Sequence, residues 1–440
     1  MKIALRAFLV TIVLALIGLH WQLNLSSTLL EPVDRASKAV SVEPLPLMVY
    51  CPGALVEVGG VSGVELGKVE RVGEALVSAS YESGSLSELP PVSSTEGFSA
   101  IAEQGEQSTN LISILQAQAI DRERSSGLAA TYCAKPTASG WLLNGSAVVG
   151  SESVLIAANP SAVEALVEID FHFQGRIVSE RIALAPQERK LIPTAAYANG
   201  ERQFAISFQS SGPAISMVLQ NRETRGLQPI GVELEPVTSN PAKMHYFVGF
   251  RPLTQGFENA RLRIYNPGID SSEVVVTAFG LENVELFRTQ VGPGSFSDIE
   301  LIVGEGHQLI ALEASAEVIA AIKNPTIDPI LDFAWIQPAE LFSSVTVPLS
   351  TYRNNLVIAN PEATALEITL EVNFGSRTSL ETAVVAPYSQ LVLPLSGVSV
   401  RVDGSSLFGV ALEILDPAGY SVVSPTESAN PGRDLEIFIN

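Results

Sequence analysis

The chain contains only two cysteines, Cys51 and Cys133, and their chemistry depends on the compartment in which the protein folds. In an exported protein an even cysteine count favours one disulfide. Closing so long a loop would contribute about 4 kcal/mol to stability in the chain-entropy treatment. Two free buried thiols are the alternative. A metal site is disfavoured because no histidine accompanies the two distant cysteines.

Four histidines are the next candidates for chemistry. The sequence places His20 in an N-terminal apolar segment, His172 on the polar face of an alternating strand, His245 near a strand start and His307 after a Gly-Glu-Gly loop. A solitary exposed histidine is far more often a surface residue than a catalytic one. The chain also lacks a Gly-x-Ser-x-Gly motif, a calcium loop, a phosphate loop and a dinucleotide fingerprint. We therefore predict no catalytic residue, no cofactor and no metal centre.

Acidic residues are abundant but form no recognisable pair. Asp plus Glu number 47 against 26 Lys plus Arg, a net charge of -21, which disfavours nucleic acid as a partner. Acids such as Glu313 and Glu317 are most simply a solvated face, and an enzyme with a carboxylate site between domains is the least favoured reading. Acidic loops could hold weak calcium, with Asp270, Asp298 and Asp328 as contributors.

The elements that would position these residues are marked by a phrase that occurs three times. An apolar run ends in Asn-Pro, and a second proline follows 26 residues after the first. The three copies are Asn159-Pro160 with Pro186, Asn266-Pro267 with Pro293, and Asn360-Pro361 with Pro387. Proline ends a strand and the preceding Asn can bond its own turn, so the phrase is first a fold marker. The alternative is that the three asparagines also line a ligand surface.

Strands fill the interval between the two prolines of each copy. Leu366, Ile368, Leu370, Val372 and Phe374 alternate with polar residues, as expected of a strand with one buried face. Each unit is expected to close with a pair of strands around a small turn, as in 204–208 and 215–219 about Ser211-Gly212-Pro213. About seven such strands per roughly 100 residues predict an all-β chain of tandem immunoglobulin-like β-sandwiches.

The domain organisation follows from these repeats. We predict a stalk at 24–43, a degenerate β-domain with a long polar loop (82–109) at 44–135, and β-sandwiches at 136–235, 236–337 and 338–440. Residues 110–119 fit either a strand or a short helix.

The first 23 residues have the composition of an export segment. Lys2 and Arg6 precede an apolar run from Ala7 to Leu19. The segment is interpreted as a transmembrane signal anchor or, alternatively, a cleaved signal peptide. In both cases the rest of the chain lies outside the membrane, as a single-pass membrane protein or as a secreted one.

Several motifs together resemble a known family. They are the Cys-Pro-Gly tract from Cys51 to Gly53, Cys133 followed by Pro136, Trp-Leu-Leu-Asn-Gly-Ser from Trp141 to Ser146, and the run that closes in Asn-Pro. This combination resembles a domain-of-unknown-function family of uncharacterised, membrane-anchored extracellular proteins of actinobacteria. The resemblance implies a cell-envelope location and tandem β-domains, and it carries no catalytic residue.

Three functions are consistent with a repeated scaffold that lacks a recognisable site. The first is a non-enzymatic cell-envelope scaffold or adhesion protein that binds another envelope protein or a glycan. The second is an accessory subunit of envelope polysaccharide synthesis or export, held to a membrane partner by residues 1–23. The third is the enzyme with scattered acids. If a specific binding surface exists, we expect it between Pro44 and Ile120, where the repeat degenerates.

Overall fold

The computed structural model confirms that the chain is all-β. It describes residues 46–426 apart from 60–64, 66–67, 82–85, 87–88, 104–111, 239, 253–257, 281–282 and 327–330, together with Ala15 and strands β1 (Ser37–Val42) and β33 (Arg433–Phe438). Within these residues no helix has the length and apolar character needed to cross a bilayer. The predicted anchor or signal at 1–23, including His20, lies outside the described residues except for Ala15.

The chain folds into two compact units. Residues 1–44 and 431–440 form one, in which β1 pairs antiparallel with β33. Residues 45–430 form the other, which contains all of the sites discussed below.

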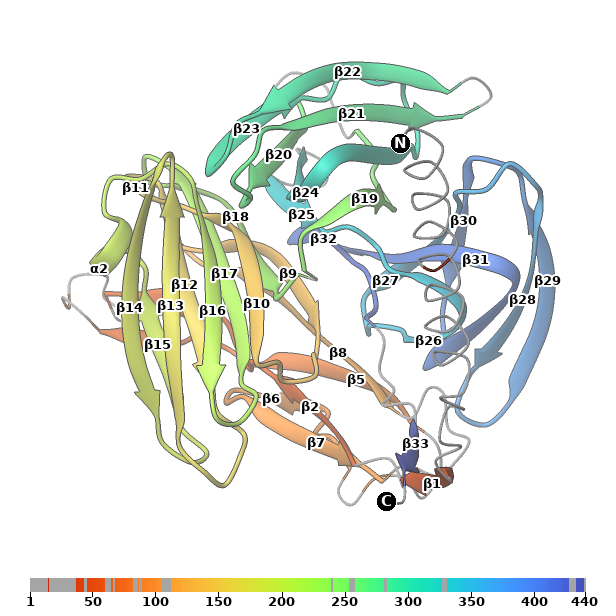
Figure 1. Ribbon diagram of the computed structural model, residues 1–440, viewed down its shortest axis with the longest axis horizontal. Helices are drawn as coiled ribbons and strands as arrows, with labels where there is room; N and C mark the ends of the chain where they lie inside the picture. Colours follow the sequence, from red (N-terminus) through yellow and green to blue (C-terminus); the bar gives the residue numbers. More distant parts are fainter. Residues whose placement is uncertain are drawn as a thin grey trace, which may run out of the picture. The chain divides into compact units, whose positions relative to one another are not determined.

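Three groups of strands in the larger unit share one topology, and we call them sandwiches 1, 2 and 3 (Figure 1). Sandwich 1 contains β10 (Ser139–Gly145), β11 (Ala147–Val148), β12 (Ser151–Ala158), β13 (Ala165–Phe173), β14 (Arg176–Leu184), β15 (Arg189–Pro193), the short helix α2 (Ala195–Ala198), β16 (Phe204–Ser211), β17 (Ser216–Arg225) and β18 (Gln228–Pro236). Sandwich 2 contains β19 (Ala242–Phe247), β20 (Arg261–Asn266), β21 (Ser272–Phe279), β22 (Val284–Val291), β23 (Ser295–Glu300), β24 (Leu309–Thr326) and β25 (Asp332–Ile336). Sandwich 3 contains β26 (Leu341–Pro348), β27 (Arg353–Asn360), β28 (Leu366–Asn373), β29 (Thr378–Val385), β30 (Ser389–Leu395), β31 (Ser399–Asp416) and β32 (Gly419–Val423).

The two sheets of sandwich 2 share the long strand β24, and those of sandwich 3 share β31. In sandwich 3 one sheet runs β26-β31-β28-β29 and the other runs β30-β27-β31-β32, and sandwich 2 repeats this order. Sandwich 1 divides the long strand into β16 and β17, the two strands predicted on either side of the turn at Ser211-Gly212-Pro213, and each joins a different sheet. The break coincides with Gly212 at a φ of 118° and with Pro213. This order differs from the ABED and CFG sheets of an immunoglobulin domain.

The predicted alternation sets the core of each sandwich. In β28 the apolar side chains are buried and Glu367 and Glu371 are exposed, as a strand with one wet face requires. The same holds for β13, where Val167 and Ile169 are buried and Glu168 is exposed.

The N-terminal strands 47–132 form three smaller sheets. The strands are β2 (Leu47–Cys51), β3 (Val56–Val58), β4 (Val69–Arg71), β5 (Ala75–Tyr81), β6 (Ser93–Ser94), β7 (Phe98–Ala102), β8 (Ile112–Asp121) and β9 (Ser126–Tyr132). The order β6-β5-β8-β9 matches one sheet of a sandwich, and residues 112–121 are a strand rather than a helix. The prediction of one long loop at 82–109 is wrong for 98–102, because β7 pairs with β2 and buries Ala100 and Ala102.

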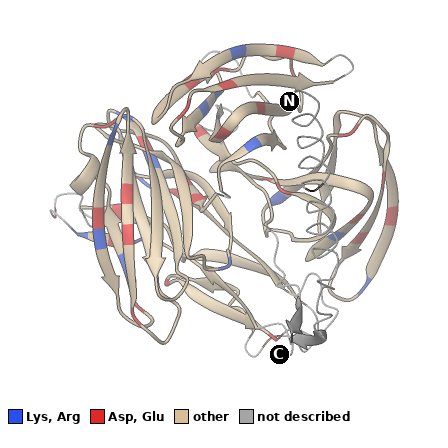
Figure 2. Ribbon diagram, in the orientation of Figure 1, with Lys and Arg blue, Asp and Glu red and all other residues tan. Residues whose placement is uncertain are grey.

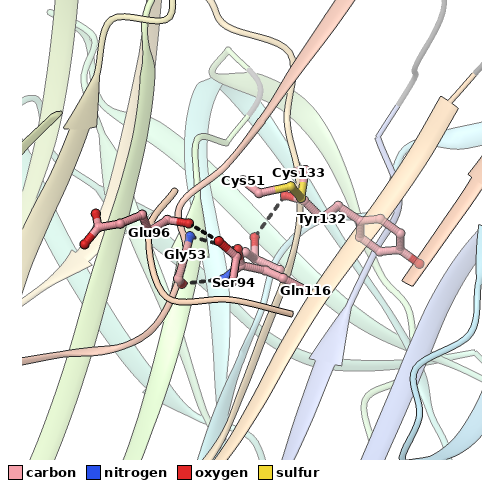
Figure 3. The surroundings of a disulfide bond; sticks show 8 residues. Cys51, Gly53, Ser94, Glu96, Gln116, Tyr132 and Cys133 are labelled. Carbon is pink, nitrogen blue, oxygen red and sulfur yellow. Dashed lines mark hydrogen bonds between the residues drawn. A yellow bond between two sulfur atoms is a disulfide. The ribbon is translucent and has the colours of Figure 1, made fainter. Parts of the chain in front are cut away.

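The predicted disulfide joins Cys51, at the end of β2, to Cys133, just after β9 (Figure 3). Gln116 lies beside it on β8, accepting from the Gly53 N–H at 3.0 Å and donating to the Gly53 carbonyl at 2.8 Å. The Cys133 N–H donates to the Ile114 carbonyl at 2.8 Å. The bridge therefore holds the end of the β2-β7 sheet onto β8 and β9.

Hydrogen bonds and ion pairs join each group of strands to the next. Gln220 of sandwich 1 bonds both backbone groups of Val56 at 2.7 Å, and Lys323 of sandwich 2 pairs with Glu223 of sandwich 1. Sandwich 2 meets sandwich 3 through the ion pair Arg251–Glu413. Sandwich 3 meets the N-terminal strands where the Tyr352 hydroxyl accepts from the Ala119 N–H at 3.0 Å. The contacts thus close a ring of four groups.

Candidate functional site at the junction of four edge strands

The last strand of each group lies at the centre of the ring. These four strands, β9, β18, β25 and β32, contact one another and occupy the middle of the larger unit in Figure 1. Each is the edge strand of its own sheet, so its unpaired backbone edge must be covered by its neighbours. We call their meeting point the junction.

One carboxylate joins the four strands. Asp332, at the start of β25, is 1% exposed. Its Oδ2 accepts from the N–H groups of Leu128 in β9 and Tyr420 in β32, each at 2.9 Å, and its Oδ1 accepts from the Phe333 N–H at 2.9 Å. The Val232 N–H of β18 is a fourth donor. Each group of strands therefore donates one backbone N–H to Asp332.

Glycine occupies the position that matches Asp332 in the other three strands. Gly127, Gly231 and Gly419 immediately precede the donors Leu128, Val232 and Tyr420. A Cβ at any of the three would collide with the Asp332 carboxylate. One acid therefore fills a space that three glycines leave open, and a side chain at all four positions would not fit.

A second buried acid lies one step further along the junction. Glu233, 2% exposed, accepts from its neighbour Leu234 at 3.0 Å and from the Ser421 hydroxyl of β32 at 3.2 Å, and it also bonds the Ala130 N–H of β9. Burial raises the pKa values of both Glu233 and Asp332 well above their ordinary range, against the effect of the donors around them. The Asp332 charge further raises the pKa of Glu233.

A third acid, Glu235, leaves the junction and holds the first strand of its own sandwich. It accepts from the N–H groups of Leu143 at 2.6 Å and Asn144 at 3.1 Å in β10. Burial raises the pKa of Glu235 to about 7, although these bonds and the charge of Arg263 oppose the shift. Glu233 and Glu235 alternate with Val232 and Leu234, a pattern that by itself predicts an exposed acidic face, and the neighbouring groups bury it instead.

A pocket opens at the end of the junction. It has about 50 Å³ of space accessible to water. Every edge strand contributes to it, with Tyr132 from β9, Glu233 from β18, Trp335 from β25 and Val422 from β32. Tyr132 and Gln337 both line it, and the Tyr132 hydroxyl and both amide atoms of Gln337 are buried and have no hydrogen-bond partner among the described residues. Such groups cost roughly 1 to 3 kcal/mol each when unpaired, so they are expected to find partners.

The histidines correct the prediction of exposed surface residues. His172 is buried between sandwiches 1 and 2, where its Nε2 lies 2.8 Å from the Ser207 hydroxyl and its Nδ1 3.1 Å from the Tyr265 hydroxyl. Burial lowers its pKa, so it is neutral at pH 7. His245 is buried in β19 and bonds the Val318 carbonyl at 2.9 Å, while His307 lies 3.7 Å from Glu413. The polar face of β13 is buried because a second sandwich packs on it.

The repeated asparagines lie inside their own turns. Asn159, Asn266 and Asn360 are each 0% exposed. The Asn360 amide donates to the carbonyls of Thr364, Val385 and Ala386, and its oxygen accepts from the Glu362 N–H. The carbonyls of 385 and 386 immediately precede Pro387, which explains the fixed step between the two prolines. Asn159 and Asn266 make the equivalent bonds just before Pro186 and Pro293.

The residue after each second proline turns the chain back. Gln187, Gly294 and Tyr388 have φ values of 60°, 59° and 51°. Proline followed by a left-handed residue is the signature of a tight turn of type II character. Pro267 and Pro361 immediately follow the last residues of β20 and β27, and Pro160 lies two residues after the end of β12.

The acids named for calcium are not brought together. Asp298 forms a bidentate pair with Arg263, and Asp270 lies in an exposed turn, while Asp328 lies outside the described residues. Glu313 and Glu317 are exposed. Within the described part of the chain no three His, Cys, Asp or Glu side chains gather as a metal-ligand group.

Charged residues lie along the outer strands of each sandwich (Figure 2). Many are paired across neighbouring strands, as in Arg181–Glu168 and Arg288–Glu273. Such exposed pairs contribute little to stability. The acids of the junction differ from these exposed pairs because they are buried.

The chain is similar in sequence to a known protein family. A model described as a family of unknown function (DUF5719) matches residues 92–396, which span the three sandwiches up to β30 and the second half of the N-terminal strands. No curated protein matches the chain.

Proposed function

The chain belongs to this family of unknown function, and we propose that it is a non-enzymatic scaffold of the cell envelope that binds an envelope polymer or protein. The observation that carries the proposal is the junction, where one acid joins four groups of strands into one body. A scaffold needs its binding surfaces held at fixed positions, and a ring whose groups are joined to one another provides this.

The chemistry of the junction supports a structural role for its acids. A catalytic carboxylate must exchange a proton with a substrate or attack it. The oxygens of Asp332 instead accept N–H groups from all four strands, so their hydrogen-bonding capacity is committed to the backbone. The disulfide supports an oxidising compartment, since such bonds persist outside the cytoplasm.

The proposal is tested by adding the purified chain to isolated cell-envelope material. We expect the chain to sediment with the envelope and to release no soluble fragment above the background of a heat-unfolded, reduced control. Release of sugar or peptide products would identify an enzyme. Failure of the native chain to sediment above the unfolded control would reject the scaffold function.

A further inference from the structure

We propose that the pocket at the end of the junction receives the acetamido group of an N-acetylated amino sugar. This inference rests on the proposed function, because it names the chemistry by which the scaffold would recognise envelope material. The observation that first points to a ligand is the set of buried polar groups without partners.

The Gln337 amide determines which hydrogen-bonding groups a ligand in the pocket must present. Its amide offers a donor and an acceptor, and neither has a partner among the described residues. The terminal torsion of a glutamine is broad and soft, so the amide can turn toward the pocket that it lines. A secondary amide presents the complementary acceptor and donor side by side. Tyr132, which is 5% exposed, also lines the pocket, and its hydroxyl has no partner among the described residues.

The charge of the lining favours a neutral ligand. Glu233 and Glu340 contribute to the pocket, and the lining contains no Lys, Arg or His among the residues that the structure describes. A carboxylate or phosphate would enter without a cation to balance it, which is unfavourable in a buried site. An acetylated amine carries no charge, unlike the free amine.

The walls and the size of the pocket suit a methyl-bearing group. Apolar side chains, including Leu234, Val237, Val422 and Val423, make up much of the lining. The space of about 50 Å³ exceeds the roughly 10 to 15 Å³ that one water occupies. A group of a few heavy atoms therefore fits, while the sugar ring would remain at the mouth.

The test is calorimetric titration of the full chain at neutral pH with N-acetylglucosamine, glucosamine and glucose. We expect binding by the acetylated sugar and at least tenfold weaker binding by the other two. Gln337→Leu should weaken binding at least tenfold, and it should fold because it replaces an unpaired buried amide by a group of similar size. Gln290→Leu, at an exposed position of β22, is the matched control and should bind normally.

The inference would be overturned by equal binding of glucose, by binding of glucosamine alone, or by unchanged binding in folded Gln337→Leu. N-acetylalanine methylamide is titrated as a further ligand, and its tighter binding would also overturn the inference, because it would assign the pocket to peptides. Absence of binding by every sugar would also overturn it. That result would leave the scaffold function standing if the chain still sediments with whole envelope material.

Discussion

The Asn-Pro turns and the junction solve the same physical problem in opposite ways. Each uses a buried polar side chain to fix backbone groups that would otherwise be unpaired. The turn does so three times with one residue type, and each asparagine holds only its own sandwich. The junction does so once, with Asp332 in one strand and glycine in the other three. The residue that recurs in all three sandwiches therefore stabilises each sandwich by itself. The residue that occurs at only one of four equivalent positions joins the groups of strands to one another.

Removing the acid of the junction should have the largest effect on stability. Asp332→Ala leaves four buried N–H groups without an acceptor, each costing roughly 1 to 3 kcal/mol, so we expect a loss of about 5 kcal/mol or more. The measurement is urea unfolding. The control is the exposed acid variant Glu317→Ala, which should change stability by less than about 0.5 kcal/mol. If Asp332→Ala lowers the free energy of unfolding by less than about 1 kcal/mol, the junction does not stabilise the chain more than a single turn does.

Filling one glycine position should cost somewhat less. Gly231→Ala places a methyl against the Asp332 carboxylate and the Phe333 ring, and overpacking of this kind costs about 1 to 3 kcal/mol. In an Asp332→Gly background the carboxylate is gone, so the same substitution should cost at least 1 kcal/mol less. Additive effects in this double-mutant cycle would mean that the glycines do not make room for the acid.

Glu235, beside the junction in β18, gives sandwich 1 a pH dependence that the turns lack. Its pKa of about 7 in the folded chain lies above its ordinary value, so the folded state binds more protons. The resulting stability is complete below about pH 4.5 and is lost as pH rises through 7, by up to roughly 3 kcal/mol. Glu235→Gln, which resembles the neutral acid, should remove this part of the slope. The wild-type chain and Glu235→Gln both keep Asp332 and Glu233, so a difference in their pH dependence comes from Glu235. The measurement is the free energy of unfolding as a function of pH, and equal slopes for the two proteins would contradict the raised pKa of Glu235.

The smallest effect is expected at a turn. Asn360→Ala removes the bonds to three carbonyls and one N–H, which we expect to cost about 2 kcal/mol, with the damage confined to sandwich 3. Hydrogen exchange should quicken in β27 and β29 and remain unchanged in sandwiches 1 and 2. The exposed Asn199→Ala is the control. Faster exchange throughout the ring would remove the distinction between local and joining contacts.

The sequence predicts the features that depend on local pattern. Alternation identified β13 and β28, the even cysteine count identified the disulfide, and Asn-Pro marked three equivalent turns. The junction could not be predicted in this way, because Val232-Glu233-Leu234-Glu235 has the pattern of a strand with one wet face. Only packing by other groups of strands buries the two acids, and the same packing buries His172. Aligning the last strands of the four groups would have shown Asp332 in the place of Gly127, Gly231 and Gly419, which is the one available signal.

The most direct test of the central claim is residue-resolved amide hydrogen exchange in Asp332→Ala. If one carboxylate holds all four edge strands, the amides of Leu128, Val232 and Tyr420 should exchange faster together, although they belong to three groups other than that of Asp332. The wild-type chain and Glu317→Ala should protect all three. Faster exchange in β25 alone, with the other three amides still protected, would contradict the account.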